Sequence, residues 1–282
     1  MIIDCHMHLN NYSEVPVSLE ERFQRLVAQL DKHSIDRGFV ITSYAANERR
    51  PSITKVLDIV KSEPRLSVIE GMSLSGRAPF DLAATEERLR RGEVIGLKLY
   101  PGYEYFDPTD GICEAIYDLA MTYDVPVVIH TGDTYNVRAK IKYSHPLHID
   151  EVAVDHPDLK IVMAHLGNPW FRDTAEIIYK NPNVYADISG LVLGDIKTGF
   201  EQWLANQVKE IIGFAGDPDK LLFGSDWPIV NVGPYLRLID HLDLTDEERE
   251  KILWRNTAEL FRIPESPPKA KRERKPQEAI RE

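Results

Sequence analysis

Short apolar segments rich in β-branched residues recur along the chain, and helix-like stretches separate them. Eight of these segments are predicted to form strands: 1–6, 37–43, 66–72, 94–100, 125–130, 160–166, 184–190 and 221–226. Amphipathic or helix-favouring stretches lie between them, including 19–33, 81–92, 111–124 and 200–215. This alternation of strands and helices indicates an α/β protein with a parallel sheet.

The number of repeats distinguishes two parallel architectures. Eight strand–helix units match the (β/α)8 TIM barrel, which typically takes about 250 residues. A doubly wound open sheet is the alternative, and it is less favoured because no G-x-G-x-x-G follows the first strand. A last helix is predicted over 244–263, with a capping box from Thr245 to Glu248 and an end before Pro264. We therefore expect one barrel domain over residues 1–264.

Composition narrows the classes of partner. The chain has 282 residues and a formal net charge of -11, which argues against a nucleic-acid binder, because such proteins need a basic surface. No apolar run approaches the length of a membrane span, and the first residues do not resemble a secretory leader. Cys5 and Cys113 form no C-x-x-C pair and predict no disulfide framework. We expect a cytoplasmic protein that binds a small molecule, and the sequence leaves a homo-oligomer open.

The last segment, 265–282, differs from the rest of the chain. It is basic and has few apolar residues, so it is predicted to be a disordered tail. A tether for nucleic acid or membrane is the alternative to a solvated tail, and we favour the solvated tail.

Chemically capable side chains stand at the carboxyl ends of five predicted strands, where barrel enzymes keep their active sites. They are His6 and His8 on the first strand, Lys98 on the fourth, His130 on the fifth, His165 on the sixth and Asp226 on the eighth. Alternate strand residues share a face, so His6 and His8 point the same way. Lys98 alternates with the apolar Leu97 and Leu99, which predicts that Lys98 points into the barrel.

Each of these residues has an ordinary structural interpretation. A histidine at a strand end is often a hydrogen-bonded structural residue, Asp226 could cap a helix, and Lys98 could pair with a carboxylate. Burying the whole set without a cation, however, would leave polar groups poorly paired. Three imidazoles and a carboxylate are typical of a catalytic site for zinc or a similar ion, with room left for water.

Five motifs surround these residues: DCHMH at 4–8, GLKLYP at 96–101, VVIHTGD at 127–133, VMAHLGN at 162–168 and FGSDWP at 223–228. In these motifs the chain resembles the amidohydrolase superfamily over residues 1 to about 262. Within this superfamily, the chain most resembles the amidohydrolase-related branch, which includes aminocarboxymuconate-semialdehyde decarboxylase and lactone hydrolases. The resemblance implies a metal-dependent (β/α)8 barrel.

The resemblance also implies roles for single residues. His6, His8, His130 and Asp226 match the metal ligands of the family. His165 matches a histidine that activates water in single-metal members and binds the second ion in two-metal members. Lys98 matches the position of a lysine that can be carbamylated and bridge two ions. We expect one divalent ion, zinc first, with Mn²⁺ or a two-metal site as alternatives.

The expected reaction starts from a hydroxide that is available at neutral pH. Bound Zn²⁺ lowers the pKa of water from about 15.7 to about 7. This hydroxide could attack a lactone, ester or amide carbonyl, with Asp226 or His165 carrying the proton to the leaving group. Decarboxylation of an unsaturated or aromatic carboxylic acid is the alternative, and a non-catalytic metal-binding protein is a further one. A serine hydrolase is disfavoured because no G-x-S-x-G is present.

Substrate-binding residues are expected near the same strand ends. Lys98 could bind a carboxylate or carbonyl oxygen, and Arg138 lies in a basic loop after the fifth strand. Tyr100, Trp170 and Trp227 follow the fourth, sixth and eighth strands and could line a pocket for a small ring. A surface charge cluster and simple loop packing are the alternatives for these side chains.

Overall fold

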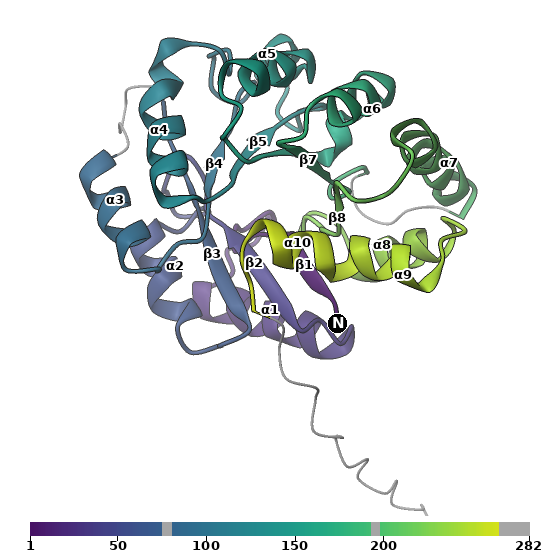
Figure 1. Cartoon of the computed structure of the whole chain (residues 1–282). Coiled ribbons are helices and arrows are strands. Elements are labelled where there is room, and N and C mark those ends of the chain that lie inside the picture. The colour runs from purple at the N-terminus through teal and green to yellow at the C-terminus, as the bar shows by residue number, and fades with distance from the viewer. Residues whose placement is uncertain (75–80, 193–197, 265–282) are drawn as a thin grey trace, which may run out of the picture.

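Eight parallel strands form a single sheet that curves into a barrel. The computed structural model describes residues 1–74, 81–192 and 198–264 (Figure 1). Its strands are β1 (Ile3–Met7), β2 (Arg37–Ile41), β3 (Leu66–Gly71), β4 (Leu97–Leu99), β5 (Val127–His130), β6 (Ile161–Ala164), β7 (Val184–Asp187) and β8 (Leu221–Leu222). They are arranged in chain order from β1 to β8, and each pairs in parallel with the next. The predicted TIM-barrel fold is confirmed, although all eight strands are shorter than predicted.

Backbone hydrogen bonds between β1 and the segment after β8 close the barrel. Cys5 donates its N–H to the carbonyl of Phe223 at 3.0 Å, and Asp226 donates to the carbonyl of His6 at 2.8 Å. His8 then donates to the carbonyl of Trp227 at 2.7 Å. The closure therefore places Asp226 beside His6 and His8, although more than two hundred residues separate them in the chain.

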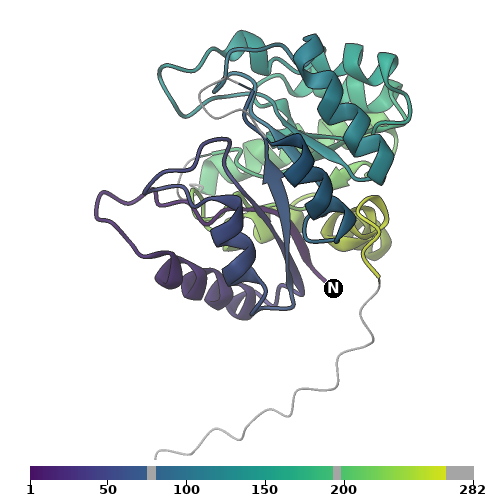
Figure 2. The same cartoon turned by 90° about the vertical axis from the view of Figure 1, so that its left-hand side faces the viewer.

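Helices surround the strands (Figure 1 and Figure 2). They are α1 (Leu19–Lys32), α2 (Ile53–Val60), α3 (Leu82–Arg90), α4 (Glu114–Tyr123), α5 (Leu147–Asp155), α6 (Phe171–Lys180), α7 (Thr198–Ala215) and α8 (Val232–Asp240). Short 3-10 turns occupy Gly111–Cys113, Ile141–Ser144 and His165–Gly167. None of the helices in the described ranges is long and apolar enough to cross a membrane.

The predicted last helix is divided into three parts. α9 (Asp246–Glu250) begins with the predicted capping box, in which Thr245 and Glu248 each satisfy the other's backbone N–H. A π-helical turn over Lys251–Arg255 separates it from α10 (Asn256–Leu260). In this turn the carbonyl of Ile252 accepts a hydrogen bond from Phe223 at 3.0 Å, just after β8. The predicted tail, 265–282, lies outside the described residues.

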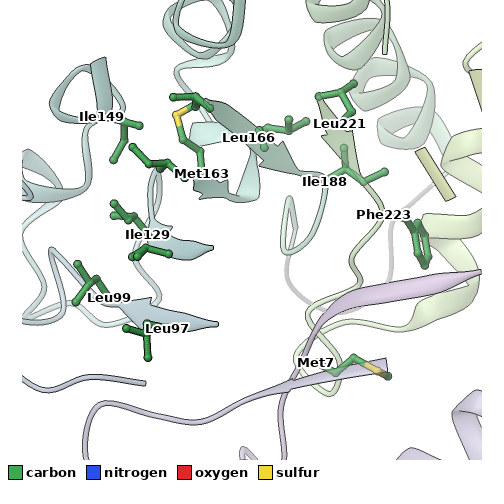
Figure 3. Packing of buried hydrophobic residues seen from close by; sticks show 14 of the residues in the cluster. Met7, Leu97, Leu99, Ile129, Ile149, Met163, Leu166, Ile188, Leu221 and Phe223 are labelled. Atoms are coloured by element: carbon green, nitrogen blue, oxygen red, sulfur yellow. The ribbon is translucent and has the colours of Figure 1, made fainter. Parts of the chain in front are cut away.

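Alternation along the strands produces two apolar layers. Residues such as Leu97, Leu99 and Ile129 pack outward in the layer between strands and helices, part of which Figure 3 shows. Val128 and Val162 belong to a second cluster that also includes α10 and Phe261. The Phe261 ring would lie 3.3 Å from a Cβ on Gly96, just before β4, so this cluster fills the amino-terminal end of the barrel. The carboxyl end is left for polar side chains.

Strand β1 departs from simple alternation. Its register with β2 shifts between Asp4 and Met7, which marks a bulge or a similar irregularity. Cys5 packs in the inner cluster, His6 lines the central cavity, and Met7 packs in the outer layer. Two successive side chains thus face the barrel interior, and bulges next to active sites commonly re-aim a side chain in this way.

Candidate functional site

His6, His8 and Asp226 lie together at the floor of a cavity at the carboxyl end of the barrel. The Nε2 atoms of His6 and His8 lie 3.9 Å and 3.2 Å from Oδ1 of Asp226. Metal–nitrogen and metal–oxygen bonds of about 2.1 Å place neighbouring ligand atoms roughly 3–4 Å apart. Spacing and donor type therefore fit one divalent cation.

Hydrogen bonds to the other ring nitrogens decide which atoms face this point. Nδ1 of His8 lies 2.8 Å from the carbonyl oxygen of Ile41, and Nδ1 of His6 lies 2.8 Å from Oδ2 of Asp187. A carbonyl only accepts, so the proton of neutral His8 is on Nδ1 and Nε2 carries a lone pair. Such partners fix the tautomer of metal-binding histidines.

The floor of the cavity fits a cation electrostatically. Burial lowers the pKa of His6 to about 4, so this imidazole is neutral at pH 7, as a metal ligand must be. Oδ1 of Asp226 is buried and has no hydrogen-bond donor within the described residues. A carboxylate oxygen that faces imidazole lone pairs is unfavourable unless a positive ion lies between them.

Asp187 is the main site residue that the sequence analysis missed. Besides His6, its carboxylate accepts hydrogen bonds from the backbone N–H of His165 at 3.0 Å and of Ser189 at 3.1 Å. Burial raises its pKa, but the charge and hydrogen bond of His6, with His165 and Lys98, outweigh burial and hold it below its usual range. His6, His165 and Asp187 form a second group whose donor atoms lie within 4.8 Å of one another. With its oxygens already satisfied, Asp187 is best understood as the residue that orients His6.

His165 lies beside the first group. Its Nδ1 contacts the carbonyl oxygen of Ser189 at 3.1 Å and Ser189 Oγ at 2.9 Å. Because the carbonyl accepts, Nδ1 carries the proton in the neutral ring and Nε2 is left without one. Burial lowers the pKa of His165 as well. The ring lines the cavity and can accept a proton there.

His130 occupies the cavity but has a different orientation from that of the other two predicted histidine ligands. Its Nε2 lies 3.0 Å from the carbonyl oxygen of Asp133, and its ring centre lies 5.1 Å from that of His165. It belongs to neither group of close donor atoms among the described residues. The structure thus brings together three of the four predicted ligands and places the fourth in the same cavity wall.

Lys98 points into the barrel as its strand phase predicts. The side chain is 1% exposed, and Nζ has no hydrogen-bond partner in the described part of the chain. It lies 5.4 Å above the ring of Tyr100. Burial lowers the pKa of Lys98 to about 8, with Asp187 and Asp226 opposing the shift. A buried amine without a partner is costly, so a ligand that interacts with it would gain binding energy.

Unusual backbone conformations carry two of the site residues. His165 and Asp226 have φ values of 65° and 68°, in the left-handed region that residues other than glycine rarely adopt. Gly190, with φ 59°, lies against both side chains, because a Cβ there would lie 2.6 Å from His165 Nδ1 and 2.8 Å from Asp226 Oδ2. We call the backbone around His165, Gly190 and Asp226 the cradle. Such local strain is concentrated at functional sites.

Tyrosines form much of the cavity wall. They are Tyr12, Tyr44, Tyr100, Tyr103 and Tyr135. The rings of Tyr44 and Tyr100 have centres 5.1 Å apart, and the hydroxyl of Tyr100 donates to the carbonyl of Thr42 at 2.6 Å. Arg50 also lines the cavity, with its guanidinium 5.1 Å above the Tyr44 ring. No described carboxylate pairs with Arg50, and the sequence analysis did not single it out.

Three predicted substrate-binding residues lie elsewhere. Arg138 is exposed, and its backbone carbonyl accepts from the hydroxyl of Tyr105. Trp170 packs on His145, with ring centres 4.5 Å apart, and Trp227 lines a separate surface groove beside Arg22. None of the three is among the described residues that line the central cavity. The paths of the loops place Arg50, and not Arg138, in the central cavity. Alternation along a strand does not determine these paths.

Comparisons with known proteins agree with this architecture. Gamma-resorcylate decarboxylase from a Polaromonas species is 27% identical in an alignment of 128 positions, which covers 38% of this chain and 36% of that protein. This chain therefore matches only about a third of the length of that relative.

Solved structures match over nearly the whole chain. A probable 2-pyrone-4,6-dicarboxylic acid hydrolase from Acinetobacter baumannii, with citric acid bound, has a TM-score of 0.67 and 15% identity, covering 93% of this chain and 99% of that chain. A dihydroxybenzoic acid decarboxylase from a Polaromonas species, with manganese and 2-nitroresorcinol bound, has a TM-score of 0.67 and 13% identity, covering 94% and 98%. At these identities the structures establish a shared fold.

The family follows from the sequence. The model of the amidohydrolase family matches residues 3–263, nearly the whole chain. It includes all five motifs and every residue of the cavity floor. The protein belongs to the amidohydrolase family.

Proposed function

We propose that this protein is a divalent-metal-dependent carboxy-lyase that removes CO₂ from a small planar carboxylic acid. The observation that carries the proposal is the composition of the central cavity at the strand ends. A set of possible metal ligands lies at its floor, tyrosines form its wall, and Arg50, which pairs with no carboxylate among the described residues, also lines it. The matched segment of a decarboxylase gives additional support.

His6, His8 and Asp226 would hold the ion. A bound divalent ion supplies positive charge that stabilises anionic oxygens of the substrate. Two imidazoles and a carboxylate suit zinc and manganese, and a dihydroxybenzoic acid decarboxylase of the same fold binds manganese. We therefore propose a single divalent ion and place manganese beside zinc.

Arg50 would bind the substrate carboxylate or a ring oxygen. A planar guanidinium forms paired hydrogen bonds with a carboxylate, and contact with the Tyr44 ring would help to orient that of Arg50. Tyr44, Tyr100 and Tyr103 would stack against or enclose a flat ring, since aromatic pairs favour centre distances of about 4.5–7 Å. An aromatic or conjugated acid fits this wall better than a flexible aliphatic one.

Proton delivery would fall to Lys98, because the neutral ring of His165 carries no proton on Nε2. Decarboxylation breaks a carbon–carbon bond, leaves the electron pair on carbon, and requires one proton to replace CO₂. Both side chains line the cavity, and Lys98 is protonated below its pKa of about 8. Its position also allows a hydrogen bond to a substrate oxygen.

Hydrolysis of a cyclic ester such as a pyrone is the second candidate. The free Nε2 of His165 favours it, because this atom can take a proton from an attacking water. A pyrone hydrolase of the same fold also supports it. The sequence analysis put hydrolysis first, whereas the decarboxylase relative moves it to second place.

One experiment separates the two reactions. The manganese-loaded protein is incubated with dihydroxybenzoates and with 2-pyrone-4,6-dicarboxylate in ¹⁸O-labelled water, and CO₂ and label in the products are measured. We expect CO₂ from a dihydroxybenzoate, with no ¹⁸O in the ring product. Labelled ring-opened product without CO₂ would establish the hydrolase instead, and turnover of neither compound would contradict both proposals.

Two arginine variants test the cavity assignment. Arg50→Gln is expected to raise KM at least tenfold and keep bound metal, since it removes a paired charge contact of about 1.5–3 kcal/mol. Arg138→Gln is the matched control, because it removes the same charge outside the cavity and should leave KM unchanged. The opposite ranking of the two variants would exclude Arg50 as the anion-binding residue.

A further inference from the structure

Helix α7 exposes an aromatic stripe on its outer face. Phe200, Trp203, Gln207, Glu210 and Phe214 follow one another at spacings of three and four residues, so they share one side of the helix. The three aromatic members are between 42% and 54% exposed. A stripe with this spacing is typical of a helix face that packs on another helix.

Helix α6 extends the stripe into a broader patch. It runs beside α7 in the ring (Figure 1). Phe171, near the start of α6, lies 6.1 Å from Trp203, and Tyr179, near its end, lies 5.5 Å from Phe214, both measured between ring centres. Tyr179 is 60% exposed. The patch thus has one aromatic group at each end.

A groove between the two helices joins these groups. Its lining is Phe171, Arg172, Ala175, Gln207, Glu210, Ile211, Gly213 and Phe214. Arg172 and Glu210 are both exposed, and neither forms an ion pair with a described residue. The groove is separate from the central cavity, so the proposed reaction does not account for it.

We propose that this patch is the interface of a homodimer with two-fold symmetry, in which the α6–α7 face of one copy packs antiparallel on that of its partner. In a two-fold interface both copies contribute the same patch. Each group on the patch must therefore have its complement elsewhere on that patch, supplied by the other copy. Antiparallel packing brings the Phe200–Trp203 end of one copy against the Tyr179–Phe214 end of the other. Phe200 and Phe214 are fourteen residues apart, about 21 Å along the helix, which sets the length of this contact.

The charges agree with the same symmetry. Arg172 lies near the start of α6, and Glu210 lies in the second half of α7. Reversing the direction of the patch across a two-fold axis brings Arg172 of one copy toward Glu210 of the other, twice per dimer. A second copy of this chain therefore satisfies both unpaired charges at once, and it is the occupant that the patch fits.

The size of the patch is also adequate. Tyr179, Phe200, Trp203 and Phe214 are about half exposed, and a large aromatic side chain buries roughly 200 Å², so they offer about 400 Å² per protomer. A standard interface takes about 800 Å² from each partner. The aromatics would supply half, and the polar residues around the groove would supply the rim.

Light scattering after size exclusion and sedimentation velocity of the full-length, metal-loaded protein test the proposal. The wild type is expected to contain two chains per particle at micromolar concentration. The variant Trp203→Glu/Phe214→Glu is expected to be a monomer with an unchanged circular dichroism spectrum, because loss of aromatic anchors weakens a dimer by about a hundredfold. Ile112→Glu changes a 50% exposed residue before α4 and should remain a dimer.

Charge reversal tests the symmetry itself. Arg172→Glu and Glu210→Arg are each expected to weaken the dimer, and the double variant Arg172→Glu/Glu210→Arg to restore it, since the pairs re-form with exchanged charges. Both single variants change only exposed residues, so they should fold. A monomeric wild type, a dimer that survives Trp203→Glu/Phe214→Glu, or a double charge variant no tighter than the single ones would each overturn the proposal.

Discussion

Replacing Gly190 by alanine is expected to disrupt the metal centre while leaving the barrel folded. Gly190 has φ 59°, and a Cβ at this position would lie 2.6 Å from Nδ1 of His165 and 2.8 Å from Oδ2 of Asp226. Distances below 3.0 Å are not tolerated by real Cβ atoms, so either the loop after β7 or the two side chains must move. Movement of Asp226 would separate it from the Nε2 atoms of His6 and His8.

The cost can be estimated from two contributions. Alanine in the left-handed region costs about 1–2 kcal/mol, and overpacking a tight site costs about 1–3 kcal/mol. The sum, about 2–5 kcal/mol, corresponds to a fall in Tm of roughly 4–10 °C for a chain of this length. Displaced residues around a metal site typically weaken metal affinity by about 10–100-fold.

Gly92→Ala is the matched control. Gly92 has φ 67° and no atom within 4 Å of its would-be Cβ, so this variant carries the backbone strain without the steric contact. The assay is manganese and zinc titration by calorimetry, together with thermal unfolding of the metal-free proteins. We expect both variants to lose stability and only Gly190→Ala to lose metal affinity. Equal metal affinity in Gly190→Ala and Gly92→Ala would refute the role assigned to this cradle.

Three further predictions concern single side chains. His8→Ala should abolish stoichiometric metal binding in elemental analysis, and metal content equal to that of the wild type would remove His8 from the ligand set. Lys98→Met should retain one ion per chain and lose most turnover. It should also gain about 1–3 kcal/mol of stability, because the buried Nζ of Lys98 has no partner among the described residues. Two ions in the wild type and fewer in the variant would instead indicate a lysine-bridged pair of ions. Arg88→Ala should lower the free energy of urea unfolding by about 3–5 kcal/mol, because it leaves the carboxylate of Glu70 buried without its bidentate partner. The control Arg90→Ala breaks a solvent-exposed pair and should leave unfolding unchanged, so equal effects of the two arginine variants would contradict this reasoning.

The barrel could be predicted from the chain because its signals are local. Segments such as 125–130 and 160–166 are short, apolar and bounded by polar residues, and each corresponds to a strand. The inward direction of Lys98 also follows from alternation within one strand, and the structure agrees. Strand length was less predictable, since pairing with neighbours determines where a strand ends, and β4 retains only Leu97–Leu99.

Asp187 shows how the strand-end rule depends on the predicted strand length. It is the last residue of β7, but the predicted strand extended to residue 190, so the rule did not identify Asp187 as a strand-end residue. Its role was less accessible than its position. Whether a buried carboxylate binds an ion or orients a histidine depends on its hydrogen-bond partners, and those of Asp187 come from β1 and from the turn after β6.

Local sequence patterns were sufficient to predict the eight strand–helix units, their parallel arrangement and the strands whose carboxyl ends lead to His6, His8, His165 and Asp226, because alternation and apolar periodicity act over a few residues. Which of these side chains meet depends on the tertiary fold. Closure of β1 on the segment after β8 brings Asp226 to His8, the register shift in β1 sets the direction of His6, and the loop paths put Arg50 in the cavity and Arg138 outside it. These outcomes depend on contacts between residues distant in the chain, which no local pattern encodes.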